Sequence, residues 1–94
     1  MARFTRLARR IRRFAAQGRY TLTPYAEMRK GLRELEDDEL LAVLTCGKVV
    51  EVYPDRGRAK ICGRVRGGEA LNVVVEFDVA GEILIIISTF FEDR

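Results

Sequence analysis

The sequence predicts an α+β domain in which two or three N-terminal helices pack on a four-stranded antiparallel β-sheet. Up to residue 47 the apolar residues mostly recur three and four positions apart, which is typical of helices with one buried side. From Lys48 onward they recur at every second position, which is typical of strands. Helices followed by closely connected strands indicate the α+β class. A chain of 94 residues with 48% apolar residues suffices for one domain, spanning 1–94.

Residues 1–19 are predicted to form a basic amphipathic helix. They carry seven arginines and no acid, whereas residues 20–94 carry ten basic and fourteen acidic residues, so the net charge of +3 is the sum of +7 and −4. The apolar positions at helical spacing are Phe4, Leu7, Ala8, Ile11, Phe14 and Ala15. The candidates on the other side for binding nucleic acid are Arg9, Arg10, Arg12 and Arg13. The same arginines suit an anionic membrane surface or an acidic partner, or they are simply the solvated side of a helix that covers the sheet.

Two further helices are expected before the strands. One begins after Thr23, which suits the N-cap, and Pro24 suits the first helical position. Gly31 weakens or ends this helix. The other opens on four acids at 36–39, which complement the helix dipole. This structural role is a sufficient reason for the acids, and it is preferred to a catalytic carboxylate pair.

Four strands are predicted at 48–53, 58–66, 70–79 and 82–91. Turn residues separate them at 54–57, 67–69 and Ala80-Gly81. Residues 83–87 of the last strand are apolar on both faces. This strand is therefore expected in the interior of the sheet, or with its second face covered by another element or by a second subunit in a homodimer.

The apolar pattern of the second and third strands predicts their register. A three-residue loop at 67–69 keeps the apolar side chains of both strands on one face, whereas a two-residue loop mixes the faces. The predicted cross-strand pairs are Arg66 with Ala70, Arg64 with Asn72, Lys60 with Glu76, Arg58 with Asp78 and Ile61 with Val75. In this register Arg64 and Arg66 have no acid opposite them, so both are candidates for binding nucleic acid.

Several kinds of chemistry are not indicated. Histidine is absent, and the two cysteines, Cys46 and Cys62, do not make a four-ligand zinc site, so neither a metal nor a cofactor is predicted. Both thiols are expected to be buried and reduced. No run of about 18 apolar residues is present, so no membrane insertion is expected. Arginines interrupt the apolar residues of the N-terminus, which is unlike a secretory signal and favours the cytoplasm.

One polar constellation stands out in the second predicted helix. Tyr25, Arg29 and Arg33 are spaced four residues apart and project along one side of it. Tyrosine offers a ring for stacking and a hydroxyl group, and arginine offers a planar fork that holds phosphate oxygens. Both contacts suit RNA. The alternative is an ordinary solvated helix face.

The same stretch resembles a known family. The segments that carry the resemblance are "TPYAEMRKGLREL" at 23–35, "GKVVEVYP" at 47–54, "ICGRV" at 61–65 and "LNVVV" at 71–75. Over roughly residues 20–91 they resemble a prokaryotic domain family of unknown function related to BrnT-like and RelE-like toxins. Members of that family often have histidine where this chain has Tyr25 and Asn72, and glycine where it has Glu34.

The resemblance implies a toxin-like helix-then-sheet core over residues 20–94, with RNA as the substrate class and an antitoxin protein as a partner. It also implies a metal-independent endoribonuclease in which Tyr25, Arg29 and Arg33 are the catalytic groups. These would orient the 2′-hydroxyl group and stabilise the charge of the phosphorane, which needs no titrating base. The alternative is a non-catalytic nucleic-acid-binding or protein-interaction module of the same fold.

Overall fold

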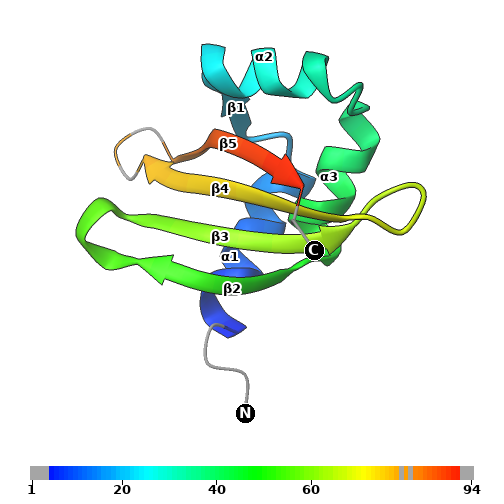
Figure 1. Cartoon of the computed structure of the whole chain (residues 1–94). Helices are drawn as coiled ribbons and strands as arrows, with labels where there is room; N and C mark the ends of the chain where they lie inside the picture. Colours follow the sequence, from blue (N-terminus) through cyan, green and yellow to red (C-terminus); the bar gives the residue numbers. More distant parts are fainter. Residues whose placement is uncertain (1–4, 79, 81, 92–94) are drawn as a thin grey trace.

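The computed structural model describes residues 5–78, 80 and 82–91 (Figure 1). Phe4 of the predicted N-terminal helix, the last predicted residue of the third strand, Val79, and the turn residue Gly81 lie outside this part. The elements, in chain order, are α1 (Thr5–Ala16), β1 (Tyr20–Leu22), α2 (Pro24–Leu32), α3 (Asp37–Cys46), β2 (Lys48–Tyr53), a 3-10 turn η1 (Pro54–Arg56), β3 (Arg58–Arg64), β4 (Ala70–Asp78) and β5 (Ile83–Phe91). The predicted α+β class and the three helices before the main strands are confirmed.

The sheet has five strands in the order β1-β5-β4-β3-β2, and it is mixed. The pairs β2–β3, β3–β4 and β4–β5 are antiparallel, as predicted, but β1 pairs with β5 in parallel. The prediction of four antiparallel strands is therefore wrong in its count and in the direction of one edge. A three-residue strand is too short to show an alternating pattern, and its partner lies more than sixty residues away in the sequence.

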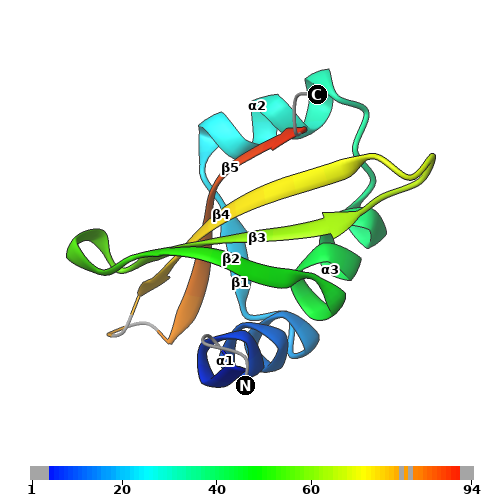
Figure 2. The same ribbon diagram turned by 60° about the horizontal axis from the view of Figure 1, so that its bottom comes forward.

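Helices α1 and α3 pack against each other and cover one face of the sheet (Figures 1 and 2). Ile11 and Ala15 of α1 are buried, which identifies the apolar side of this helix as part of the core. Phe14 also contacts Phe77 of β4 edge to face, with ring centroids 5.6 Å apart. The inward-facing sheet residues in the core are Ala59, Ile61, Leu71, Val73, Val75, Leu84 and Ile86. The opposite face of the sheet, called the open face, carries neither α1 nor α3.

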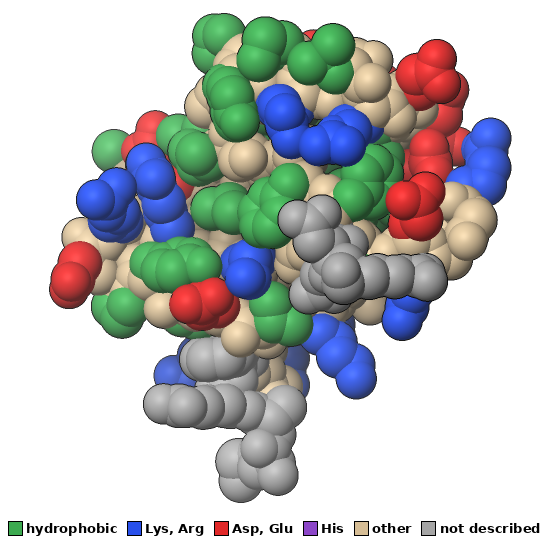
Figure 3. Space-filling view, viewed as in Figure 1, with side chains coloured by type: hydrophobic (Ala, Val, Ile, Leu, Met, Phe, Trp, Pro, Cys, Tyr) green, Lys and Arg blue, Asp and Glu red, His purple; other side chains and the backbone are tan. Residues whose placement is uncertain are grey.

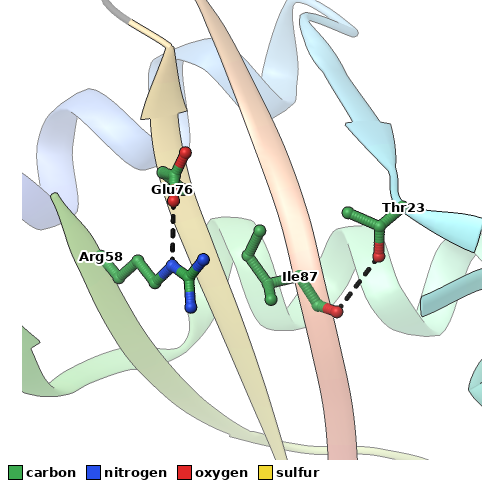
Figure 4. Close-up of polar contacts among 4 residues, drawn as sticks. All are labelled: Thr23, Arg58, Glu76 and Ile87. Atoms are coloured by element: carbon green, nitrogen blue, oxygen red, sulfur yellow. Dashed lines mark hydrogen bonds and ion pairs between the residues drawn. The ribbon is translucent and has the colours of Figure 1, made fainter. Parts of the chain in front are cut away.

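Strand β5 lies inside the sheet, as the sequence predicts, and two elements share its outer edge. Strand β1 pairs with Leu84–Ile86, and α2 runs beside the following part of β5. Thr23 connects the two, because its backbone N–H donates to Ile86 O at 3.0 Å and its hydroxyl group donates to Ile87 O at 3.2 Å (Figure 4). The same hydroxyl oxygen accepts from Ala26 N at 3.1 Å, so the predicted N-cap is confirmed.

The register of β3 and β4 differs from the prediction by two residues. Arg58 pairs with Glu76 and Arg64 with Ala70, and Lys60 faces Val74. The predicted pairs of Arg58 with Asp78, Lys60 with Glu76, Arg64 with Asn72 and Arg66 with Ala70 are therefore wrong, as is Ile61 with Val75, since Ile61 faces Val73. A shift of two residues keeps every side chain on its predicted face, so the apolar pattern does not distinguish the two registers.

The cause of the shift is a longer turn. Residues 65–69 all belong to the connection, which Val65 N closes by donating to Glu69 O at 3.0 Å. Gly67 and Gly68 have φ values of 87° and 81°, a backbone region that residues with a Cβ atom rarely adopt. Strand β3 consequently ends at Arg64, and Arg66 lies in the turn.

Candidate nucleic-acid interface

Helix α2 brings Tyr25 and Arg29 into contact. Tyr25 is 52% exposed, and the Arg29 guanidinium carbon lies 6.0 Å from the centroid of its ring. This distance is the outer limit of a cation–π contact, so the two side chains stand side by side on one helix face. The Nε of Arg29 is shielded from solvent and has no hydrogen-bond partner among the described residues. Tyr25 and Arg29 are therefore the part of the predicted constellation that forms a local unit.

Arg33 is placed differently, because α2 ends before it and it serves as the C-cap. Its guanidinium carbon lies 5.7 Å from the centroid of Phe91 at the end of β5. Arg33 and Arg66 line a common surface hollow of about 290 Å³. The same hollow is lined by Glu34, Glu36, Glu39 and Glu69. Two arginines among four carboxylates do not favour a phosphate group, so the hollow itself is a poor anion site.

Three acids of the 36–39 cluster have structural roles, as the sequence predicts. Glu36 is the N-cap of α3, and its backbone N–H donates to Glu39 Oε1 at 3.1 Å in a capping box. Glu39 Oε2 accepts from the backbone N–H of Arg66 at 3.2 Å, which holds the β3–β4 turn against the start of α3. Asp37 pairs with Lys30 at 2.6 Å and raises the pKa of that amine.

Arg64 ends β3 on the same hairpin as Arg66. It is exposed, and its Nη1 donates to Gly68 O at 2.6 Å. Among the described residues, no ring contact, ion pair or hydrogen bond joins Arg64 to Tyr25, Arg29 or Arg33. Tyr25 and Arg29 thus form one pair on α2, and Arg33 and Arg66 line one hollow. Arg64 belongs to neither group.

The arginines predicted on the first helix are all exposed. On α1, Arg9 and Arg13 lie opposite the buried Ile11, and Arg10 and Arg12 flank it. The guanidinium carbon of Arg10 also lies 4.8 Å from the centroid of Phe77, so it covers the edge of the core. Because the apolar side of α1 is buried in the core, the surface that this helix offers to a partner is basic. Among the described residues, no helix is long and apolar enough to span a membrane.

The candidate arginines make no ion pair among the described residues, and neither do Arg6, Lys48 and Arg56. In the part of the chain that the structure describes, four cations contact carboxylates: Arg19 with Glu82 at 3.5 Å, Lys30 with Asp37 at 2.6 Å, Arg58 with Glu76 at 2.9 Å, and Lys60 with Glu51 at 3.2 Å (Figure 4 shows Arg58 and Glu76). None of the eight arginines that the sequence proposes as site residues is among them: Arg9, Arg10, Arg12, Arg13, Arg29, Arg33, Arg64 and Arg66. Within the described part of the chain, these eight therefore keep their charge uncompensated by direct pairing.

Tyr25 and Asn72, which the resemblance pairs with histidines, lie on different elements. Tyr25 is exposed on α2, whereas Asn72 is 2% exposed on the open face of the sheet, with Cys62 and Phe90 as cross-strand neighbours. Cys62 is half-buried and Cys46 is exposed, so the expectation that both thiols are buried is wrong for Cys46; both are free. The described residues contain no group of three His, Cys, Asp or Glu side chains placed to hold a metal ion.

Two side chains beside the constellation were not singled out from the sequence. Met28 is 52% exposed and Leu32 is 70% exposed, and both lie on the same side of α2 as Tyr25. Their spacing of four residues is the signal that identifies a shared face, but such spacing usually marks the buried side of a helix. Only the structure shows that this particular side faces solvent.

A protein-family model described as "Domain of unknown function (DUF4258)" matches residues 23–91. The match begins at the N-cap of α2 and ends with β5, so α1 and β1 lie outside it. No curated protein matches the sequence.

Proposed function

The chain belongs to this domain family of unknown function, which confirms that part of the resemblance, and we propose that it is a toxin-like, RNA-directed protein. In this proposal Tyr25 and Arg29 of α2 contact the RNA locally, and the arginines of α1 bind its phosphates over a longer path. An antitoxin protein is the partner that the proposal implies.

One observation carries the proposal: the eight candidate arginines, four of them together on α1, have no carboxylate partner among the described residues. A guanidinium group that is already paired gains little from a phosphate, since it must give up one anion to bind another. Unpaired, exposed arginines bind phosphates and release the counterions of the nucleic acid, which is the main source of sequence-independent affinity.

The Tyr25–Arg29 pair favours RNA in an unstacked, single-stranded form. An exposed tyrosine ring offers a surface on which a base can stack, and the adjacent guanidinium reaches the phosphate of the same nucleotide. The exposed ring and the 6.0 Å contact support this arrangement because the two groups lie together on one helix, with Arg29 half-buried beside the ring.

The contact between Tyr25 and Arg29 also favours a second candidate, a metal-independent endoribonuclease. In that reaction the 2′-oxygen forms a bond to phosphorus, the bond from phosphorus to the 5′-oxygen breaks, and water takes the 2′-proton and supplies one to the 5′-oxygen. Arg29 would stabilise the added charge on the phosphorane, with Tyr25 and Arg33 orienting the RNA. Histidine, the commonest general base, is absent from the chain, and electrostatic stabilisation of the phosphorane does not require one.

The test is a binding titration with fluorescently labelled single-stranded RNA of about 16 nucleotides, read by anisotropy. We expect Arg29→Ala and the double variant Arg9→Ala/Arg13→Ala each to weaken binding about tenfold. Arg56→Ala is the matched control, since Arg56 is an exposed arginine on η1 away from both helices, and it should leave the affinity nearly unchanged.

The salt dependence provides a second readout. Each lost phosphate contact should lower the slope of log K against log salt by about 0.7 for single-stranded RNA. Equal weakening by Arg56→Ala, or affinity unchanged by the helix variants, would overturn the proposal. Gel analysis of the same RNA after incubation decides between the two candidates: intact RNA excludes the endoribonuclease, and cleavage lost in Arg29→Ala supports it.

A further inference from the structure

Helix α2 exposes an apolar stripe formed by Tyr25, Met28 and Leu32. Their exposed fractions are 52%, 52% and 70%, and their spacing of three and four residues places them on one side of the helix. Hydrophobic side chains accordingly gather over α2 at the top of the molecule in Figure 3. The other large apolar side chain exposed to this degree among the described residues is Val50, which lies alone on β2.

The stripe does not serve the fold of the described residues. Helix α2 is held to the sheet from its other side, where Ala26 is fully buried, and by the hydrogen bonds of Thr23 to β5. Three large apolar side chains in solvent on a nine-residue helix therefore contribute little to stability. Contiguous exposed apolar surface of this kind marks an interaction site.

The charges beside the stripe indicate what covers it. Arg29 follows Met28 and Arg33 follows Leu32, so the two arginines border the stripe on the side that turns toward the sheet. Neither has a carboxylate partner among the described residues. A complementary surface therefore presents apolar side chains with carboxylates along one border.

We propose that the stripe of Tyr25, Met28 and Leu32 docks an acidic amphipathic helix of a partner protein. Apolar side chains of the partner at helical spacing cover the stripe, and a glutamate or aspartate of the partner pairs with Arg29, since glutamates already surround Arg33. The docking uses Met28 and Leu32, which the RNA proposal does not, so it stands whether or not the protein binds RNA.

Two other occupants fit less well. A nine-residue helix offers little apolar area for insertion into a membrane surface. A second copy of this chain, docked by antiparallel pairing of the two α2 helices, would bring Arg29 of both copies to the same border, where the two like charges repel each other. Charge complementarity thus favours the acidic helix.

The probe is a labelled synthetic helical peptide of about 18 residues, with leucines along one side and glutamates flanking them. We expect saturable binding by anisotropy, and a shift of the Met28 methyl resonance on addition of the peptide. The double variant Met28→Ala/Leu32→Ala should weaken binding at least about tenfold while keeping the helix, because alanine favours helix. Replacing the peptide glutamates by lysine should weaken it to a similar extent.

Val50→Ala is the matched control, because it removes a comparably exposed apolar side chain elsewhere, and it should not change peptide binding. The RNA titration of Met28→Ala/Leu32→Ala should match that of the unmodified protein, which keeps the two proposals separate. The inference is overturned by absent or unsaturable peptide binding, or by equal affinity for the acidic and basic peptides. It is also overturned if the double variant abolishes sedimentation with anionic vesicles or dissolves a dimer, since a membrane or a second copy is then the occupant.

Discussion

The guanidinium carbon of Arg29 lies 6.0 Å from the centroid of the Tyr25 ring, whereas that of Arg33 lies 5.7 Å from Phe91 beside a hollow lined by four glutamates. The two arginines are four residues apart, Arg29 on α2 and Arg33 at its C-cap, but their electrostatic surroundings differ. Arg29 is next to an exposed aromatic ring, and Arg33 is next to carboxylates that repel a phosphate. Arg29 and Arg33 therefore should not contribute equally to the binding of RNA.

Arg29→Ala should weaken RNA binding about tenfold, and Arg33→Ala by about threefold or less. The reason is that glutamates near Arg33 already offset part of its attraction for an anion. Parallel anisotropy titrations of the two variants measure the difference. A larger loss in Arg33→Ala would place the phosphate at the hollow instead.

Thr89→Val should stabilise the protein by about 1 kcal/mol. Thr89 is fully buried in β5, and its Oγ1 has no hydrogen-bond partner among the described residues. Valine has nearly the same shape and removes the cost of the unpaired hydroxyl group. Thermal or urea unfolding measures the change.

Thr45→Val is the matched control for that substitution. The hydroxyl group of Thr45 donates to Leu41 O at 2.9 Å, so its removal loses a hydrogen bond and should bring no gain. A loss of stability in Thr89→Val would show that its hydroxyl group is satisfied in solution.

Two glycine substitutions should change stability in opposite directions. At Gly47, where α3 turns into β2, an added Cβ would lie 2.8 Å from Ile61 Cγ2 and 2.9 Å from Cys62 O, so Gly47→Ala should destabilise the protein by about 1–3 kcal/mol. At Gly31, inside α2, nothing lies within 4 Å of such a Cβ. Gly31→Ala should therefore stabilise the protein by about 0.5–1 kcal/mol. Urea unfolding of both variants checks the signs, and a gain for Gly47→Ala would contradict the packing described at the end of α3.

Acid should weaken the edge of the sheet through Glu51. Hydrogen bonds from Tyr53 and then from Lys60 hold the pKa of the Glu51 carboxyl below its ordinary value of 4.5. Because the pKa is lowered in the folded state, this group stabilises the fold above its ordinary pKa, and the contribution disappears as the pH falls through the folded value. The free energy of unfolding of Glu51→Gln, measured between neutral and acid pH, should fall less steeply than that of the unmodified protein. Parallel curves for the two proteins would show that Glu51 is unpaired in solution.

The sequence predicts the elements well where the signal is local. Thr23 followed by Pro24 marks the start of α2, the acids at 36–39 mark the start of α3, and alternation marks the two faces of the sheet. Each of these depends on neighbours within a few residues. The predicted register of β3 and β4 was wrong by two positions, because two glycines at positive φ allow a longer turn that the apolar alternation cannot detect.

The candidate site, too, was predicted correctly only where the signal is local. The periodicity of α2 correctly places Tyr25 and Arg29 side by side, since four residues are about one helical turn. The hollow that Arg33 shares with Arg66 depends on the contact between the β3–β4 turn and Glu39 of α3, 27 residues away. No periodicity predicts such a contact.

By itself, the sequence determined the α+β class, the order of the main elements and the family, because these follow from local periodicity, capping residues and a motif that runs along the chain. Tertiary structure alone decided the parallel pairing of β1 with β5, the distribution of the arginines over separate surfaces, and the exposure of Met28 and Leu32. These depend on which distant segments pack together, and burial is a property of that packing rather than of any short stretch of residues.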